Sequence, residues 1–352
     1  MKAYLLEEFG ADLVEREVDD PVPTGSEVLV RVTSTGLCHS DLHFHEGFMD
    51  LGGGHRLDVE HIGIHLPHAL GHEVYGRIED FGPESGLTDD DRERPVIVYP
   101  WLGCGTCGLC TSGHDLMCPE RSEIGVQRPG GHAEKIIVGN ARYLIDAAGI
   151  DPVLAGSYAC SGLTSYSSLT KLGPLHDQWI GIIGLGGVGL MALAVAKGIG
   201  FENVVAIDID DAKLKLATDQ YGADRVFNAK SGDVVEAVTA DVGKLAGVVD
   251  YVGSGDTFHQ AAGLLRPGGV SVTVGLFGGE LSFPLPPFIV QQLVFRGSFV
   301  GTLAELEELM AHVRQGKVKP IPATPVPFGQ VNEKIKELRE GKITGRVVLT
   351  HG

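Results

Sequence analysis

The stretch Trp179-Ile-Gly-Ile-Ile-Gly-Leu-Gly-Gly-Val-Gly189 decides the architecture of this chain. Its first five residues form a short apolar run typical of a buried strand, and the Ala-rich segment from Val188 to Ile199 has the pattern of a helix. The turn between them fits G-x-G-x-x-G, a spacing that permits a tight turn, close approach of a phosphate and close helix–strand packing. The stretch therefore predicts a parallel sheet that binds the pyrophosphate of a dinucleotide at a helix N-terminus. The residues of this turn are Gly184, Leu185, Gly186, Gly187, Val188 and Gly189.

Strands and helices alternate around this turn from about residue 160 onward, which is typical of a doubly wound parallel sheet. Asp208 ends the next strand, roughly 20 residues after Gly184. A carboxylate there accepts the ribose hydroxyls of NAD and repels the 2′-phosphate of NADP. Lys213 either reaches the same ribose or lies on a solvated helix face, and Asp210 and Asp211 are expected to cap that helix. The predicted strands are 179–183, 203–207, 248–252 and 270–274, and the predicted helices are 188–199, 211–221 and 302–315.

The first third of the chain is rich in strand and loop patterns. Strands are predicted at 27–33, 73–79 and 95–99, and Pro and Gly recur at short intervals between them. This texture indicates an irregular barrel or sandwich with metal-bearing loops. The last segment, 345–350, is again a strand. The expected domains are 1–161, 162–298 and 299–352, the last being a return of the chain to the first domain.

Composition limits the functions open to the chain. Its 352 residues are enough for about two domains. A formal net charge of −18 repels phosphate backbones, so nucleic acid is not an expected partner. No run of 18 uncharged apolar residues occurs, and Glu7 and Glu8 precede any signal-like run, so we expect neither a membrane span nor a secretory signal. The expected location is cytoplasmic, where thiols stay reduced and the six cysteines point to metal binding or catalysis.

Four of the cysteines, Cys104, Cys107, Cys110 and Cys118, follow the spacing C-x2-C-x2-C-x7-C. Four thiolates so close together surround one tetrahedral ion and leave no position open to water, so the sequence predicts a structural zinc site. An iron–sulfur cluster is the alternative, because cysteines at this two-residue spacing also suit it.

The other two cysteines, Cys38 and Cys160, lie far apart in the sequence. With His72 they form a set of two thiolates and one imidazole, which leaves the fourth position of a zinc ion open to an alcohol or carbonyl oxygen. Taken alone, these thiols are more often core residues than ligands. Eight of the 14 histidines fall between residues 39 and 72, and we expect most of them to be loop or surface residues. His72 is preferred as the ligand because it lies in the run Gly-His-Glu.

Together these motifs resemble the zinc-dependent medium-chain alcohol dehydrogenases, and most closely their tetrameric bacterial and archaeal branch. The resemblance runs from GLCHSDLH (36–43) and GHE (71–73) through the cysteine cluster and GLGGVG (184–189) to GRVVLT (345–350). It implies a Rossmann-type doubly wound sheet, a β-rich GroES-like catalytic domain, and NAD and two zinc ions per chain, one catalytic and one structural. It also implies a small alcohol, aldehyde or ketone as substrate and a homo-oligomer, with a tetramer preferred over a dimer.

The resemblance assigns roles around the catalytic metal. Cys38, His72 and Cys160 correspond to its ligands, with Glu73 as a neighbouring carboxylate that is sometimes a ligand. Asp41 corresponds to the carboxylate that orients the metal-bound histidine.

A proton relay and further coenzyme contacts follow from the same resemblance. Ser40 takes the proton of the alcohol, and His43 passes it through the nicotinamide ribose to solvent. Two simpler interpretations remain open: Ser40 caps a helix, and Arg346 is an ordinary surface charge. The coenzyme contacts expected outside the glycine-rich turn are His39, Thr164, Val274, Gly275, Leu276 and Arg346.

One segment departs from the family's shorter members. The extra loop, roughly 49–66, is rich in Gly and His, and we expect it near the cleft mouth or a subunit contact. Phe48 and Trp101 are the candidate residues of an apolar substrate pocket.

A polyol or sugar dehydrogenase of the same superfamily is the alternative function, although such enzymes often place a carboxylate where this chain has Cys160. A zinc-ribbon binding module and a redox-inactive structural protein are the alternatives from other classes.

Overall fold

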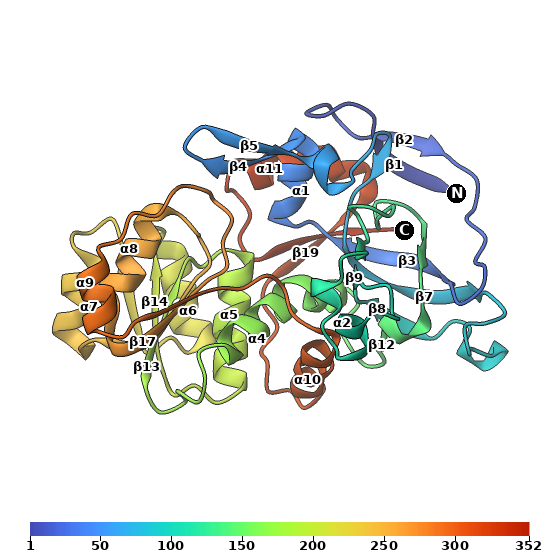
Figure 1. The fold of residues 1–352 in the computed structure, drawn as a ribbon. Helices are drawn as coiled ribbons and strands as arrows, with labels where there is room; N and C mark the ends of the chain where they lie inside the picture. The colour runs from blue at the N-terminus through green and yellow to red at the C-terminus, as the bar shows by residue number, and fades with distance from the viewer. Residues whose placement is uncertain (352) are drawn as a thin grey trace.

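The computed structural model describes residues 1–351, which form two lobes side by side (Figure 1). One lobe is an α/β unit built from the middle of the chain, and the other is rich in strands and contains both chain ends. The C-terminal segment crosses back from the α/β lobe into the β-rich lobe, where β19 (Ala323–Pro327) lies.

The α/β lobe contains a six-stranded parallel sheet in the order β15-β14-β13-β16-β17-β18. The first strand of the lobe, β13, therefore lies in the middle of the sheet. The strand order runs outward from β13 through β14 to β15 on one side and through β16 to β18 on the other. Ligands of such folds bind at the point between β13 and β16 where the strand order switches sides. The strands are β13 (Trp179–Ile183), β14 (Asn203–Asp208), β15 (Arg225–Asn228), β16 (Leu245–Asp250), β17 (Leu265–Thr273) and β18 (Val294–Gly297).

Helices cover both faces of this sheet. Because side chains alternate along a strand, Ile182 packs with α5 and α6, whereas Ile183 belongs to the separate cluster that contains α7 and α8. The helices are α5 (Gly187–Gly198), α6 (Asp211–Tyr221), α7 (Val234–Val242), α8 (Gly255–Leu264) and α9 (Leu285–Val290). The predicted doubly wound sheet is therefore confirmed.

The β-rich lobe is organised around β3, which pairs with β7, β11 and β20. The strand order of this sheet is β12-β8-β7-β3-β20-β19, and β11 pairs with β3 outside this order. Its strands are β3 (Val28–Gly36), β7 (Glu73–Phe81), β8 (Pro95–Val98), β11 (Lys135–Val138), β12 (Leu144–Asp146), β19 (Ala323–Pro327) and β20 (Arg346–Thr350). A smaller sheet joins β1 (Lys2–Leu6), β2 (Val14–Glu17) and β6 (His68–Ala69), and β9 (Trp101–Leu102) pairs with β10 (Ser122–Glu123).

Several helices lie in the β-rich lobe or at its border with the α/β lobe. They are α1 (His39–Glu46), α2 (Gly108–Thr111), α3 (Ala155–Ser157), α4 (Leu163–Thr170), α10 (Leu303–Arg314) and α11 (Val331–Arg339). The predicted helix 302–315 is α10, with Thr302 as its N-cap. The predicted helix 211–221 is α6, and Asp210 caps it by accepting a hydrogen bond from the Ala212 N–H. No helix within residues 1–351 is long and apolar enough to cross a membrane.

The segment 49–66 is mainly a β-hairpin rather than an irregular loop. Strands β4 (Phe48–Gly52) and β5 (His55–Asp58) pair antiparallel, and a 3-10 turn follows at Val59–Ile62. Gly52, Gly53 and Gly54 all have positive φ, which lets the chain reverse so tightly. The tip of the hairpin contacts the α/β lobe, since a Cβ added at Gly52 would lie 2.6 Å from the backbone of Gly279.

Candidate active site

Three side chains from distant parts of the sequence meet between the two lobes. Cys38 is the N-cap of α1, His72 immediately precedes β7, and Cys160 lies in a π-helical turn, Tyr158–Gly162, that leads into α4. The Sγ atoms of Cys38 and Cys160 are 3.8 Å apart, and His72 Nε2 lies 3.3 Å from Cys160 Sγ. All three residues are buried.

These separations fit one tetrahedral zinc ion. Zn–S bonds of about 2.3 Å at the tetrahedral angle place two sulfurs about 3.8 Å apart, which is the separation of Cys38 and Cys160. The ligand atoms of Cys38, His72, Cys160 and Glu73 all lie within 4.8 Å of one another. The donor set and its spacing therefore fit the metal that the sequence predicts.

The surroundings of the ligands favour an ionised Cys38. A hydrogen bond with the Cys160 thiol lowers the pKa of Cys38 well below its usual value, against the effect of burial, and its position at the start of α1 favours a thiolate. Asp41 Oδ2 accepts a hydrogen bond from the Cys38 N–H at 2.8 Å. Its other oxygen lies 3.5 Å from His72 Nδ1, so Asp41 caps the helix and also faces the far side of the imidazole.

The carboxylate of Glu73 is held in place by two polar contacts. Its Oε2 accepts a hydrogen bond from Ser157 Oγ at 2.8 Å, and its Oε1 forms an ion pair with Arg346. Both partners of the ion pair are buried, at 0% and 5% exposure. A Cβ at Gly36 would lie 2.0 Å from Glu73 Oε2, so only glycine fits there.

The two predicted relay residues lie on the first two turns of α1. Ser40 is inside the helix and does not cap it, because the N-cap is Cys38. His43 lies one turn later, half-buried, with its ring 5.8 Å from the ring of His39. Burial and the neighbouring His39 charge lower the pKa of His43 below its ordinary value of 6.5. His43 is therefore neutral and able to accept a proton at neutral pH.

The glycine-rich turn has the geometry that its spacing predicts. Gly184 has φ of 85°, and a Cβ at Gly189 would lie 1.7 Å from the Gly184 carbonyl oxygen, so both positions require glycine. A Cβ at Gly186 would meet nothing within 4 Å, which leaves open space beside this backbone. Asp208 ends β14 and accepts hydrogen bonds from the N–H groups of Leu185, Ile209 and Asp210. Its carboxylate therefore lies at the same sheet edge as the turn.

The other predicted coenzyme residues gather around this edge. Thr164 is buried on α4, whose neighbour Ser165 donates a hydrogen bond to the Val188 carbonyl at 3.0 Å. This contact ties the helix that follows Cys160 to the glycine-rich turn, and no sequence signal pointed to it. Arg346 is buried rather than a surface charge, and it lies against the first turn of α5, since a Cβ at Gly187 would be 3.1 Å from Arg346 Nη1.

The segment after β17 lies at the same edge. The N–H groups of Val274 and Gly275 donate to the carbonyl of Asp250 at the end of β16, and Leu276 is half-exposed. Lys213 is partly buried in the first turn of α6, close in sequence to Asp208. His39 is exposed at the start of α1.

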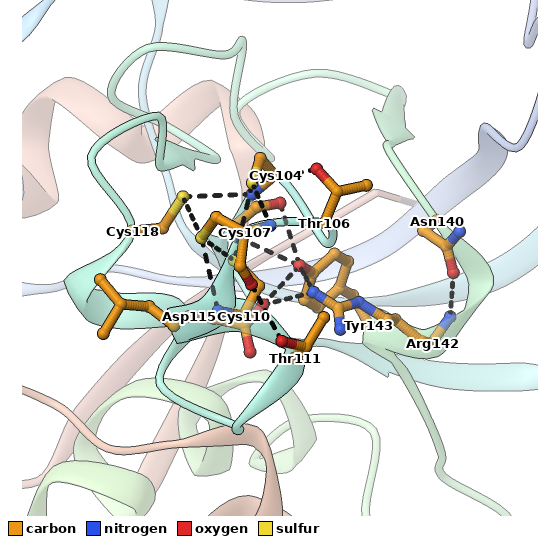
Figure 2. Close-up of polar contacts among 12 residues, drawn as sticks. Cys104, Thr106, Cys107, Cys110, Thr111, Asp115, Cys118, Asn140, Arg142 and Tyr143 are labelled. Carbon is orange, nitrogen blue, oxygen red and sulfur yellow. Dashed lines mark hydrogen bonds and ion pairs between the residues drawn. The ribbon is translucent and has the colours of Figure 1, made fainter.

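The four clustered cysteines form a second compact set (Figure 2). The sulfur of Cys107 lies 3.5 Å from that of Cys110 and 3.8 Å from that of Cys118, and Cys104 and Cys110 are 3.9 Å apart. Backbone N–H groups of the loop donate to these sulfurs, for example from Cys107 to Cys104 at 3.3 Å. Four sulfurs at these separations fit one tetrahedral ion with no open position.

Trp101, one of the two predicted pocket residues, lies beside the ligand His72. The Trp101 ring is 5.5 Å from that of His72 and 5.5 Å from that of Phe299. Phe299, which sequence reasoning missed because nothing in its local pattern marks it, is 47% exposed. Phe48, the other predicted pocket residue, lies at the base of the hairpin, with the guanidinium of Arg56 4.1 Å above its ring. The structure therefore groups Trp101 with Phe299, whereas Phe48 is covered by Arg56.

Comparison with known proteins matches both lobes. A family profile described as "Alcohol dehydrogenase GroES-like domain" covers residues 24–148, and one described as "Zinc-binding dehydrogenase" covers residues 187–315. The NAD-dependent alcohol dehydrogenase of Sulfurisphaera tokodaii is 34% identical over 99% of both chains. The crystal structure of the alcohol dehydrogenase from Aeropyrum pernix has a TM-score of 0.88 at 32% identity over 100% of both chains. The D-arabinose dehydrogenase from Sulfolobus solfataricus has a TM-score of 0.83 at 27% identity over 99% of both chains.

Proposed function

Because this chain belongs to the zinc-dependent medium-chain alcohol dehydrogenase family, we propose that it oxidises primary or secondary alcohols to aldehydes or ketones with NAD and catalyses the reverse reduction. The observation that carries the proposal is the meeting of Cys38, His72 and Cys160, together with a glycine-rich turn whose backbone is hydrogen-bonded to Asp208 at the end of β14. The chain is an oxidoreductase, and its substrate is a small molecule.

NAD and two zinc ions per chain are the cofactors. Cys38, His72 and Cys160 would hold the catalytic ion, and the four-cysteine cluster would hold the structural one. The two sets use all six cysteines, none of which forms a disulfide, in keeping with a cytoplasmic location. We also propose that residues 1–161 and 299–352 form the catalytic domain and that residues 162–298 bind the coenzyme.

Each role in the proposed reaction belongs to particular residues of this chain. When bound, zinc lowers the pKa of an alcohol hydroxyl and NAD accepts the hydride. Asp41 orients His72, and Ser157 and Arg346 hold Glu73 beside the ligand set. Ser40 takes the hydroxyl proton, and His43 passes it to solvent. Trp101 and Phe299 line the apolar side of the site.

The proposed coenzyme contacts lie along the sheet edge that carries the glycine-rich turn and Asp208. The open backbone at Gly186 admits the pyrophosphate, and Arg346 adds positive charge beside the same turn. Asp208, with Lys213 nearby, accepts the ribose hydroxyls and disfavours NADP. Thr164 and the segment Val274–Leu276 contact the nicotinamide end, with His39 on the opposite lobe.

A substrate panel tests this function. Purified enzyme is assayed with primary, secondary and cyclic alcohols and with the matching aldehydes and ketones, using NAD and NADP in parallel, and its zinc content is measured. NAD-linked turnover by protein that holds zinc is expected. Faster turnover with NADP would refute the role of Asp208, and an absence of turnover with every compound would refute the function itself.

Loss of the relay is expected to slow the reaction at neutral pH. Replacing Ser40 with alanine or His43 with glutamine should lower kcat by about 10²-fold, the lower end of what positioned acid–base groups contribute. Because the pKa of His43 is lowered, wild-type activity should persist below pH 6.5 before it falls. His45→Gln is the control, because His45 is a buried histidine of the same helix that lies beside Arg339. Equal losses in the His43 and His45 variants would argue against the relay.

The polyol or sugar dehydrogenase alternative has one specific support, the similarity to the D-arabinose dehydrogenase structure. The substrate panel includes aldoses and polyols for this reason. A preference for those compounds over simple alcohols would favour the alternative while leaving the metal and coenzyme sites unchanged.

We further propose that the chain forms a homo-oligomer, with a tetramer preferred. The edge strand β18 pairs only with β17 among the strands of residues 1–351, and apolar side chains near it, Leu285, Ile289 and Val290, are more than 60% exposed. An open strand edge beside exposed apolar residues favours pairing with a second copy. Light scattering on the purified protein measures the number of subunits.

A further inference from the structure

An ionic network that joins the buried Asp115 and Tyr143 to the more exposed Arg142 lies beside the four-cysteine site and belongs to neither predicted ligand set (Figure 2). Asp115 is 3% exposed, and its Oδ1 accepts a hydrogen bond from Tyr143 Oη at 2.8 Å and forms an ion pair with Arg142 Nη2. The Tyr143 oxygen also accepts a hydrogen bond from the Gly103 N–H at 3.0 Å. Gly103 directly precedes Cys104, so the network holds the backbone at the first cysteine.

The carboxylate of this network lies close to the sulfurs. A Cβ at Gly103 would lie 2.5 Å from Cys110 Sγ and 2.8 Å from Asp115 Oδ1, so little more than the Gly103 backbone separates them. Four thiolates around a divalent ion carry a net charge of about −2. Asp115 brings a further negative charge to the same place, which is unfavourable in a buried setting unless a cation is near.

Arg142 supplies that cation. Its guanidinium carbon lies 4.4 Å above the ring of Tyr143, and a Cβ at Gly105 would lie 3.8 Å from Arg142 Nη2. Gly105 is part of the loop between Cys104 and Cys107, so the guanidinium lies along the loop that surrounds the sulfurs. Asn140 fixes the backbone at this point by accepting a hydrogen bond from the Arg142 N–H at 3.0 Å.

We propose that Arg142, held by Asp115 and Tyr143, is a positioning residue of the four-cysteine site that balances the charge of the thiolates and thereby keeps zinc bound. The inference rests on the zinc content proposed above. Partners of this kind around a metal typically change its affinity by about 10–100-fold. Arg142 reaches both Asp115 and Tyr143 through the single atom Nη2, and a lysine at this position retains the positive charge.

The test measures the rate at which zinc leaves the enzyme in excess 4-(2-pyridylazo)resorcinol, together with thermal stability. Each variant is also made with Cys38→Ala, so that the ion released from the four-cysteine site is identified. Arg142→Gln is expected to release this ion about 10-fold faster or more, and Arg142→Lys to stay within about threefold of wild type. Arg94→Gln is the matched control, because Arg94 is similarly exposed (38% against 35%) and pairs with Asp91 instead.

Three results would overturn the proposal. Release from Arg142→Gln at the wild-type rate would remove any role for the charge. Equally fast release from Arg142→Gln and Arg142→Lys would show that the side chain acts by packing. If Arg142→Gln does not fold, the lysine variant decides alone, and tenfold faster release from it counts against the proposal. Wild-type protein that holds no zinc at the four cysteines would instead defeat the proposed metal content and this inference with it.

Discussion

Replacing His72 with alanine is expected to lower kcat/KM for alcohol oxidation by at least about 10³-fold. The imidazole is one of three ligands that meet within 4.8 Å, and the charge stabilisation supplied by a catalytic metal is several kcal/mol, with about 1.36 kcal/mol for each tenfold in rate. Steady-state kinetics and zinc analysis on the same samples check the prediction. The zinc content should fall from about two ions per chain to about one, because the four-cysteine site is separate.

His68→Ala is the control for this experiment. His68 is also buried, at 6% exposure, and lies four residues earlier in the same segment, but it belongs to neither ligand set. Its replacement should leave two zinc ions and most of the activity. A His72 variant that keeps two ions, or that stays within tenfold of wild-type activity, would contradict the site described above.

Replacing Glu73 with glutamine is expected to destabilise the β-rich lobe by about 3–5 kcal/mol, the usual cost of leaving one partner of a buried ion pair unmatched. Arg346 is 5% exposed, and Glu73 is the carboxylate with which it pairs. Urea unfolding measured by tryptophan fluorescence tests this. The chain has two tryptophans, so the Trp179→Phe background leaves Trp101 as the reporter of the β-rich lobe.

Two further variants serve as comparisons for the unfolding free energy of Glu73→Gln. Glu79→Gln removes a carboxylate from the same strand, β7, where Glu79 forms surface ion pairs with Arg31 and Lys135. Such pairs contribute about 0–1 kcal/mol. Glu73→Gln combined with Arg346→Met removes both charges and should recover much of the loss. A Glu73→Gln cost no larger than that of Glu79→Gln would show that the buried pair does not stabilise the fold.

The sequence predicted those features whose signals are local. The run from Trp179 to Gly189 contains its own strand, turn and helix start, and Gly184 and Gly189 meet a backbone and a packing demand within a few residues of each other. The four-cysteine cluster is likewise confined to residues 104–118, so its spacing alone indicates one ion. The Asp210 cap of α6 could also be predicted from the sequence, because a cap bonds only to the first turn of its own helix.

The three-dimensional structure alone decided which distant residues meet. Pairing of β3 with β7 brings the end of β3, two residues before Cys38, beside the start of β7, which directly follows His72, and the π-helical turn adds Cys160. The contact of the hairpin tip at Gly52 with Gly279, the buried Glu73–Arg346 pair and the Asp115–Arg142–Tyr143 network are also contacts between separate segments. No periodicity encodes such contacts, because the packing of sheets and lobes selects them and not the conformational preference of any one stretch.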